Sequence, residues 1–118
     1  MQDQLIQETI ESMKDYVPKL LVASEKIAFD IQSNEGVWVE TFISYLEGVH
    51  WVATAITGIQ QIDPELLSDM DVNSLGEILL KLSEALEQQD FVTLCDLLQF
   101  EMQPLLKSYD ENLRGIVN

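Results

Sequence analysis

Two side chains on one predicted helix have the spacing of a metal-binding pair. Glu47 and His50 form a Glu-x-x-His motif, which di-iron bundles use on two helices together with a glutamate from each of two others. His50 is the only histidine of the chain, and Met102 and Leu105 stand at the corresponding positions of the other half. A symmetric metal site therefore lacks half of its ligands. We expect no metal and no other cofactor, and we place His50 at the edge of the core; a metal or phosphotransfer protein that uses His50 is an alternative.

Two further patterns begin like functional motifs but are incomplete. Residues 69–73 resemble the start of a calcium loop, yet Ser74 stands where glycine is required and Leu80 where glutamate is required. Carboxylates that cap a helix explain this stretch better. Cys95 has no histidine arrangement that would make it a nucleophile, and its position is on the core side of its helix. Because no pair of carboxylates is singled out by spacing for acid–base work, we expect no catalytic residues and no enzyme.

The composition describes one acidic domain, which we take to span residues 1–118. Hydrophobic residues make up 47% of the chain, and 21 acidic against 6 basic residues give a net charge of -15. Nucleic acids and anionic membranes bind clustered positive charge, so neither is an expected partner. No apolar run approaches the roughly 20 residues of a membrane span, and the N-terminus lacks a signal-peptide pattern. One cysteine cannot form an internal disulfide, so we expect a cytoplasmic protein.

The elements that would position these residues are all helices. Apolar residues recur at helical spacing throughout, which predicts an all-α, up-and-down four-helix bundle. The expected helices span residues 2–33, 36–61, 74–88 and 91–114. We expect bends at Pro18 and Pro104; a break of the first helix at Pro18 is the competing interpretation. A short extra helical turn over 64–69, begun by Asp63 and Pro64, would bridge the second and third helices.

The turns of the two helical hairpins are short and polar. They fall at residues 33–36 and 88–90, and Ser74 and Glu77 have the spacing of a capping box that starts the third helix. Residues 26–43 also align without gaps with residues 81–98. Either the hairpin is duplicated, or two amphipathic hairpins with short turns match in phase by necessity. Both interpretations place the two turns at the same end of the bundle.

Several apolar residues fall outside the predicted core. The expected core stripe of the second helix consists of Val39, Phe42, Leu46, Val49, Ala53 and Ile56, widened by Tyr45, Val52 and Ile59. With Phe42 toward the core, Trp51 falls on the opposite side, beside the small residues Gly48, Ala55 and Gly58. Glycine inside a helix costs roughly 1 kcal/mol relative to alanine, so these glycines suggest a close approach by another group.

The first helix has a similar anomaly, because Val22 and Phe29 lie opposite its core stripe. Either another part of the chain covers these residues, or they form a partner surface for a foreign chain or a second copy. The candidate partner-binding residues are Val22, Phe29, Trp51 and Ala55.

Two stretches resemble the flagellin export chaperones, which are small acidic bundles of bacterial flagellar systems. Residues 81–98 contain a Leu-x-x-Ala-Leu pattern before the polar turn at Asp90, and residues 26–46 contain the Asn34-Glu35 turn. The chain lacks the short Asn-Pro-Tyr-like N-terminal segment of that family, so no binding residues are carried over. It resembles equally the uncharacterised small acidic helical proteins of Gram-positive bacteria.

The sequence therefore predicts a non-enzymatic protein-binding module, chaperone-like or adaptor-like, that holds an amphipathic segment of a partner. An alternative is an acidic inhibitor, an immunity protein or a nucleic-acid mimic, which would need its carboxylates gathered on one face.

Overall fold

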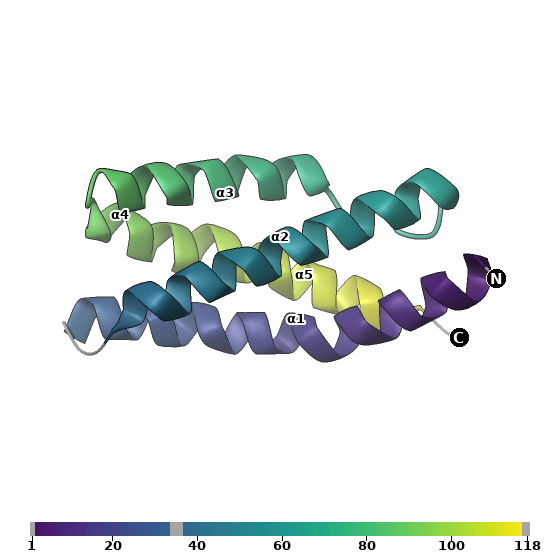
Figure 1. Cartoon of the computed structure of the whole chain (residues 1–118), viewed down its shortest axis with the longest axis horizontal. Helices are drawn as coiled ribbons and strands as arrows, with labels where there is room; N and C mark the ends of the chain where they lie inside the picture. Colours follow the sequence, from purple (N-terminus) through teal and green to yellow (C-terminus); the bar gives the residue numbers. More distant parts are fainter. Residues whose placement is uncertain (1, 34–36, 117–118) are drawn as a thin grey trace.

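The computed structural model describes residues 2–33 and 37–116, and all regular structure in these ranges is helical. The elements are α1 (Gln2–Ser33), α2 (Trp38–Ile62), α3 (Val72–Glu87), α4 (Phe91–Asp96), the π-helical segment η1 (Leu97–Met102) and α5 (Gln103–Arg114). The last three follow one another without a break and form one rod, so the described chain folds as four helical rods (Figure 1). The predicted all-α bundle is confirmed.

Consecutive rods pack side by side. Helix α1 lies against α2 on one side and against the α4–η1–α5 rod on the other, and α3 lies against α2 and the α4–η1 part of that rod. The end of α1 and the start of α2 lie at the same end of the bundle as the end of α3 and the start of α4 (Figure 1). The rings of Trp38 and Phe91, at the starts of α2 and α4, are 5.3 Å apart. This arrangement agrees with the predicted up-and-down order; residues 34–36 of the first turn lie outside the described residues.

Helix α1 continues through Pro18, as predicted. Its N-terminal part points in a different direction from the rest of the helix (Figure 1). Proline inside a helix costs about 3 kcal/mol, whereas each fully buried aliphatic side chain contributes about 1.5–3 kcal/mol. Burial on both sides of Pro18 therefore outweighs the lost backbone hydrogen bond. The fully or nearly fully buried residues of this stripe are Ile6, Ile10, Met13, Val17, Leu20 and Ile27.

The bend expected at Pro104 takes the form of a π-helical segment. Segment η1 ends just before this proline, and the backbone N–H of Gln103 donates to the carbonyl of Leu98, five residues earlier. A proline ring crowds the carbonyl four residues before it, which here belongs to Phe100. The wider π turn lies at this crowded position. Apolar spacing alone did not predict it, because the pattern continues in nearly the same phase on both sides.

The core-facing side of α2 is rotated from the predicted one. The buried residues are Phe42, Tyr45, Gly48, Val49, Val52, Ile56 and Ile59. Val39 is 43% exposed, and Leu46 and Ala53 are only half-buried. The core direction thus runs through Tyr45 and Val52, which the prediction treated as the margin of the stripe. Because α2 packs between α1 and α3, its buried side is set by two neighbours, and Trp51 lies at the flank of the stripe rather than opposite it.

The group that approaches Gly48 belongs to the same chain. Gly48 is buried, and a Cβ atom at this position would overlap the hydroxyl of Tyr16 and lie 2.9 Å from its Cζ. The Tyr16 ring meets the Trp51 ring edge to face, with centroids 5.8 Å apart. At Gly58 a Cβ atom would meet nothing within 4 Å. Gly48 therefore accommodates Tyr16 of α1, whereas no described part of the chain approaches Gly58.

Residues 64–69 form hydrogen-bonded turns instead of the predicted helical turn. Successive turns are closed by the N–H groups of Leu66, Ser68 and Met70. The side chain of Gln60 fixes this connection, because its Nε2 donates to the carbonyls of Leu67 and Met70 at 2.8 and 3.0 Å. Both Leu67 and Met70 are buried. The connection between α2 and α3 is thus held in place by the burial of these two side chains and by Gln60, without a regular helix.

Asp71, and not Ser74, caps α3. Its carboxylate accepts from the backbone N–H groups of Asn73 and Ser74 at 3.0 and 3.2 Å, and the Ser74 hydroxyl donates to it at 2.6 Å. The Ser74 hydrogen bonds lower the pKa of Asp71. The Asp71 carbonyl in turn accepts from the hydroxyl of Tyr109 at 2.6 Å, which ties the start of α3 to α5. The carboxylates of residues 69–73 therefore include a helix cap, as the sequence indicated.

Asp90 caps α4 in the same way. It accepts from the backbone N–H and the hydroxyl of Thr93 at 3.2 and 2.7 Å, and these bonds lower its pKa. Gln89 before it has a φ of 57°, the left-handed conformation that lets the chain reverse. The polar turn predicted at 88–90 is thus confirmed.

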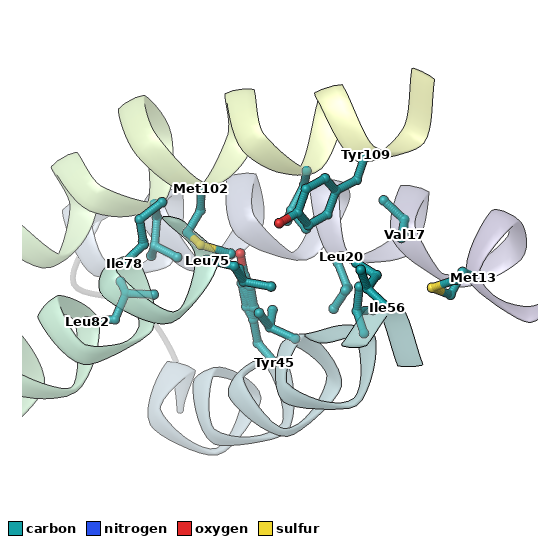
Figure 2. Close-up of a cluster of buried hydrophobic side chains, with 14 of the residues drawn as sticks. Met13, Val17, Leu20, Tyr45, Ile56, Leu75, Ile78, Leu82, Met102 and Tyr109 are labelled. Atoms are coloured by element: carbon teal, nitrogen blue, oxygen red, sulfur yellow. The ribbon is translucent and has the colours of Figure 1, made fainter. Parts of the chain in front are cut away.

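One polar pair lies inside the core. Side chains from all four rods converge there, among them those of Tyr45 and Tyr109 (Figure 2). Ser24 is fully buried; its hydroxyl donates to the carbonyl of Leu20 at 3.0 Å and lies 2.5 Å from the hydroxyl of Tyr45. With the Ser24 proton used in this way, the Tyr45 hydroxyl donates to Ser24. The pair joins α1 to α2 at a fixed register.

The contrast between the two glycines of α2 predicts opposite effects of alanine. Gly58→Ala should raise the free energy of unfolding by about 0.5–1 kcal/mol, because alanine favours the helix and space is free. Gly48→Ala should lower it by about 1 kcal/mol, because the added methyl group displaces Tyr16. Urea unfolding of both variants measures the difference. Equal stabilisation by the two substitutions would contradict the close Tyr16 contact.

The buried pair predicts a non-additive result. Ser24→Ala leaves the Tyr45 hydroxyl buried without an acceptor and should cost about 1–3 kcal/mol; Tyr45→Phe leaves Ser24 bonded to Leu20 and should cost about 1 kcal/mol. Adding Tyr45→Phe to Ser24→Ala should therefore restore part of the lost stability. A double-mutant cycle from urea unfolding tests this, and independent, additive losses would show that the two hydroxyls do not interact.

The buried tyrosines predict a loss of stability at alkaline pH. Burial raises the pKa of Tyr45 and Tyr109 above the ordinary value of about 10. A raised pKa in the folded state stabilises the fold below the unfolded value and loses that contribution as the pH rises beyond it. The free energy of unfolding should therefore fall from about pH 10 upward. Urea unfolding at stepped pH measures it; Tyr45→Phe should show a shallower fall, and identical slopes would contradict the assignment to Tyr45.

Candidate functional site

A long groove lies between α1 and the α4–η1–α5 rod. Its central part, the α1–η1 groove, has a volume of about 590 Å³, and its lining residues are Val22, Glu25, Lys26, Phe29, Gln32, Gln99 and Gln103. At Gln32 it meets a second hollow of about 210 Å³. That hollow is lined by Ile31, Gln32, Phe91, Val92, Cys95 and Asp96. The two hollows share a residue and so follow the same pair of helices.

The apolar residues of this groove are unusually exposed. Val22 is 66% exposed, Phe29 is 61% exposed and, in the second hollow, Val92 is 75% exposed. Val22 and Phe29 are seven residues apart on one helix, so they stand above one another at a distance of about 10 Å along the axis. The structure therefore places both sequence-predicted residues of α1 on one surface, uncovered by any described part of the chain.

The opposite wall comes from η1 and α5. Gln99 lies in the π-helical segment and Gln103 begins α5, just before Pro104. Their amides, with that of Gln32, offer hydrogen-bond donors and acceptors next to the apolar residues. The π turn thus lies directly in the wall of the groove. Such turns are frequent at functional positions.

Three charged side chains complete the lining of the α1–η1 groove and its extension. Glu25 and Asp96 are exposed carboxylates. The ammonium group of Lys26 lies 2.9 Å from a carboxylate oxygen of Asp30, one turn further along α1. The groove can therefore supply apolar contact, amide hydrogen bonds and negative charge.

Cys95 does not add a nucleophile to this surface. Its side chain is 4% exposed, and its thiol lies 3.7 Å from the carbonyl of Ala28, to which it donates. Burial, and to a smaller extent the neighbouring Asp96 carboxylate, raises the pKa of Cys95. The thiol stays protonated and packs as a small apolar residue.

Trp51 and Ala55 lie elsewhere. Trp51 is 42% exposed and lines a separate hollow of about 330 Å³ with Ser12, Asp15 and Tyr16, between α1 and α2. Ala55 is half-buried against the core. The four candidate partner-binding residues therefore do not form one surface: Val22 and Phe29 share the α1–η1 groove, whereas Trp51 belongs to the α1–α2 side.

Sequence reasoning missed residues on the far wall of the groove. Phe91 falls on the helically spaced apolar stripe of the fourth predicted helix but is 40% exposed, and Val92 was not singled out. Phe100 of η1, next to Gln99 in the sequence, is 70% exposed but does not line either hollow. The helical-wheel test that identified Val22 and Phe29 would have identified Phe100 in the same way. Gln99 and Gln103 gave no signal, because glutamine is ordinary on a solvated helix face.

His50 lies on the solvent side of α2 and not at the edge of the core. It is exposed, as is Glu47, and it borders a shallow hollow with Ala53 and Thr57. The rotation of the α2 core stripe toward Tyr45 explains this difference. In residues 2–33 and 37–116, no three His, Cys, Asp or Glu side chains are grouped so that they could hold a metal ion.

None of the helices in the described ranges is long and apolar enough to cross a membrane. No curated protein and no solved structure matches the chain. A family model described as a domain of unknown function, DUF8042, matches residues 8–112. This match covers both walls of the groove and most of the sequence, and the chain therefore belongs to the DUF8042 family.

Proposed function

We propose that this protein is a non-enzymatic binding module whose α1–η1 groove holds an amphipathic segment of a partner protein. The observation that carries the proposal is the exposure of Val22 and Phe29 on the rim of a groove of about 590 Å³. Exposed apolar residues that line a concave surface are typical of protein interfaces. Scattered single residues would need no explanation, but these two share one groove with polar amides beside them.

A helix is the segment that fits this groove best. Val22 and Phe29 have heptad spacing on α1, so a helix laid along α1 can pack apolar residues of the same spacing against them. The amides of Gln32, Gln99 and Gln103 then face the polar margin of the bound helix. The mode is helix-in-groove recognition, and it agrees with the resemblance to export chaperones and with an adaptor-like role in the cytoplasm.

The two alternatives have less support. Each of the four rods carries more carboxylates than basic side chains, so the negative charge is not gathered on one face as an inhibitor or nucleic-acid mimic would need. A metal or phosphotransfer role of His50 would need neighbouring ligands or acid–base partners. His50 instead borders a hollow lined by Ala53, Thr54, Thr57, Gly58 and Gln61.

The groove proposal predicts that one exposed apolar residue affects binding and an equally exposed one elsewhere does not. The probe is a synthetic helical peptide of about three heptads with leucine at the core positions and glutamine at the others. Phe29→Ser should weaken its binding by about tenfold or more. Leu80→Ser is the matched control, because Leu80 on α3 is 62% exposed and lies outside the groove.

Isothermal titration calorimetry of the full chain and both variants measures the effect, and unchanged circular dichroism verifies that they fold. The proposal fails if the peptide does not bind, or if Phe29→Ser binds it as tightly as the unmodified protein does.

A further inference from the structure

We propose that the segment held in the α1–η1 groove is cationic: an amphipathic helix whose lysines or arginines flank its apolar stripe and meet Glu25 and Asp96. This inference rests on the proposed function and adds the charge of the partner. It commits to a basic partner helix as the occupant, in place of a second copy of this chain.

Two carboxylates of the groove have no cationic partner within the described residues. Glu25 lines the α1–η1 groove and Asp96 lines its extension, and no basic side chain of the described residues pairs with either. Lys26, the lysine of the lining, already has its ammonium group 2.9 Å from Asp30. A bound segment therefore meets two carboxylates whose charge is not neutralised within the chain, and cations on that segment are favoured.

The charge of the whole molecule acts in the same direction. The net charge is -15, and five of the six basic side chains lie within 4.0 Å of a carboxylate of the same chain. The field around the groove thus attracts cationic segments and speeds their encounter. Two copies of the chain would each bring this charge to a shared interface, where like charges repel. Charge complementarity therefore selects a basic partner over self-association.

The geometry allows one helix to make both kinds of contact. Val22 and Phe29 form an apolar ridge about 10 Å long, and Glu25 lies between them in the sequence of α1. Lysine and arginine have long aliphatic stems that cover apolar surface while their charged ends reach sideways. A helix whose apolar residues pack on the ridge can therefore extend its flanking cations to carboxylates beside it.

Three peptides with the same leucine pattern test the charge of the occupant. Their remaining positions are filled with lysine, glutamine or glutamate, and binding to the full chain is measured by calorimetry at low and high salt. We expect the lysine peptide to bind at least about tenfold more tightly than the glutamine peptide and the glutamate peptide not to bind. The affinity of the lysine peptide should fall as salt is raised.

Two charge-reversal variants distinguish the contribution of the groove carboxylates to binding from that of the net charge. Glu25→Lys with Asp96→Lys reverses the groove carboxylates, and Glu84→Lys with Glu87→Lys makes the same change of net charge on exposed residues of α3. The groove variant should bind the lysine peptide about tenfold or more weakly than the unmodified protein does. The α3 variant should lose about threefold in affinity or less. Circular dichroism and urea unfolding verify that both fold.

Each other outcome overturns the inference in a recognisable way. If the glutamine peptide binds as tightly as the lysine peptide and depends on Phe29, the groove proposal stands and the cationic partner is wrong. If no peptide binds, both are wrong. If the α3 variant weakens binding as much as the groove variant, Glu25 and Asp96 are not the contact. A Phe29-dependent dimer in sedimentation that strengthens with salt would identify a second copy as the occupant.

Discussion

The bundle depends on the continuous apolar stripe of α1, which is buried by α2 on one side and by the α4–η1–α5 rod on the other. A helix in such a position can bury a stripe of limited width, and its remaining surface is expected to be polar. In α1 this holds over much of the first half, where the outward residues include Glu8, Glu11 and Asp15, although Leu5 near the N-terminus is 59% exposed. It fails over the second half, where Val22 and Phe29 face outward. The groove is therefore the place where two exposed apolar residues of α1 share one surface.

Both helical rods that form the groove contain a proline near it. Pro18 lies one turn before Val22 on α1, and Pro104 directly follows Gln103 of the opposite wall. Each proline removes a backbone hydrogen bond and changes the helix locally, by a bend in α1 and by the π-helical segment η1 in the other rod. The hollow therefore lies beside the two places where these rods depart from straight α-helical geometry.

Apolar periodicity was sufficient to predict the four rods, the continuity of α1 and the turn at Asp90, because these follow from local sequence and the need to bury one face. It failed where a neighbour decides the outcome. A wheel centred on Phe42 placed Trp51 opposite the core and His50 at its edge, whereas contacts with both α1 and α3 rotate the buried side of α2. For the same reason the sequence could not show that Trp51 and Phe29 lie on different surfaces. A projection of a single helix does not show which pair of rods a residue lies between.

Exposed Val22 and Phe29 are not explained by the stability of the bundle. Valine and phenylalanine favour the helix less than alanine or glutamate does, and side chains that stay in water contribute little hydrophobic stabilisation. The net charge of -15 also opposes the compact state through self-repulsion. A cationic amphipathic helix in the groove would act on both terms, because it removes apolar surface from water and offsets negative charge. Any ligand that binds only the folded state stabilises it, so the features that are least favourable for the free bundle are those that such a partner would convert into stability.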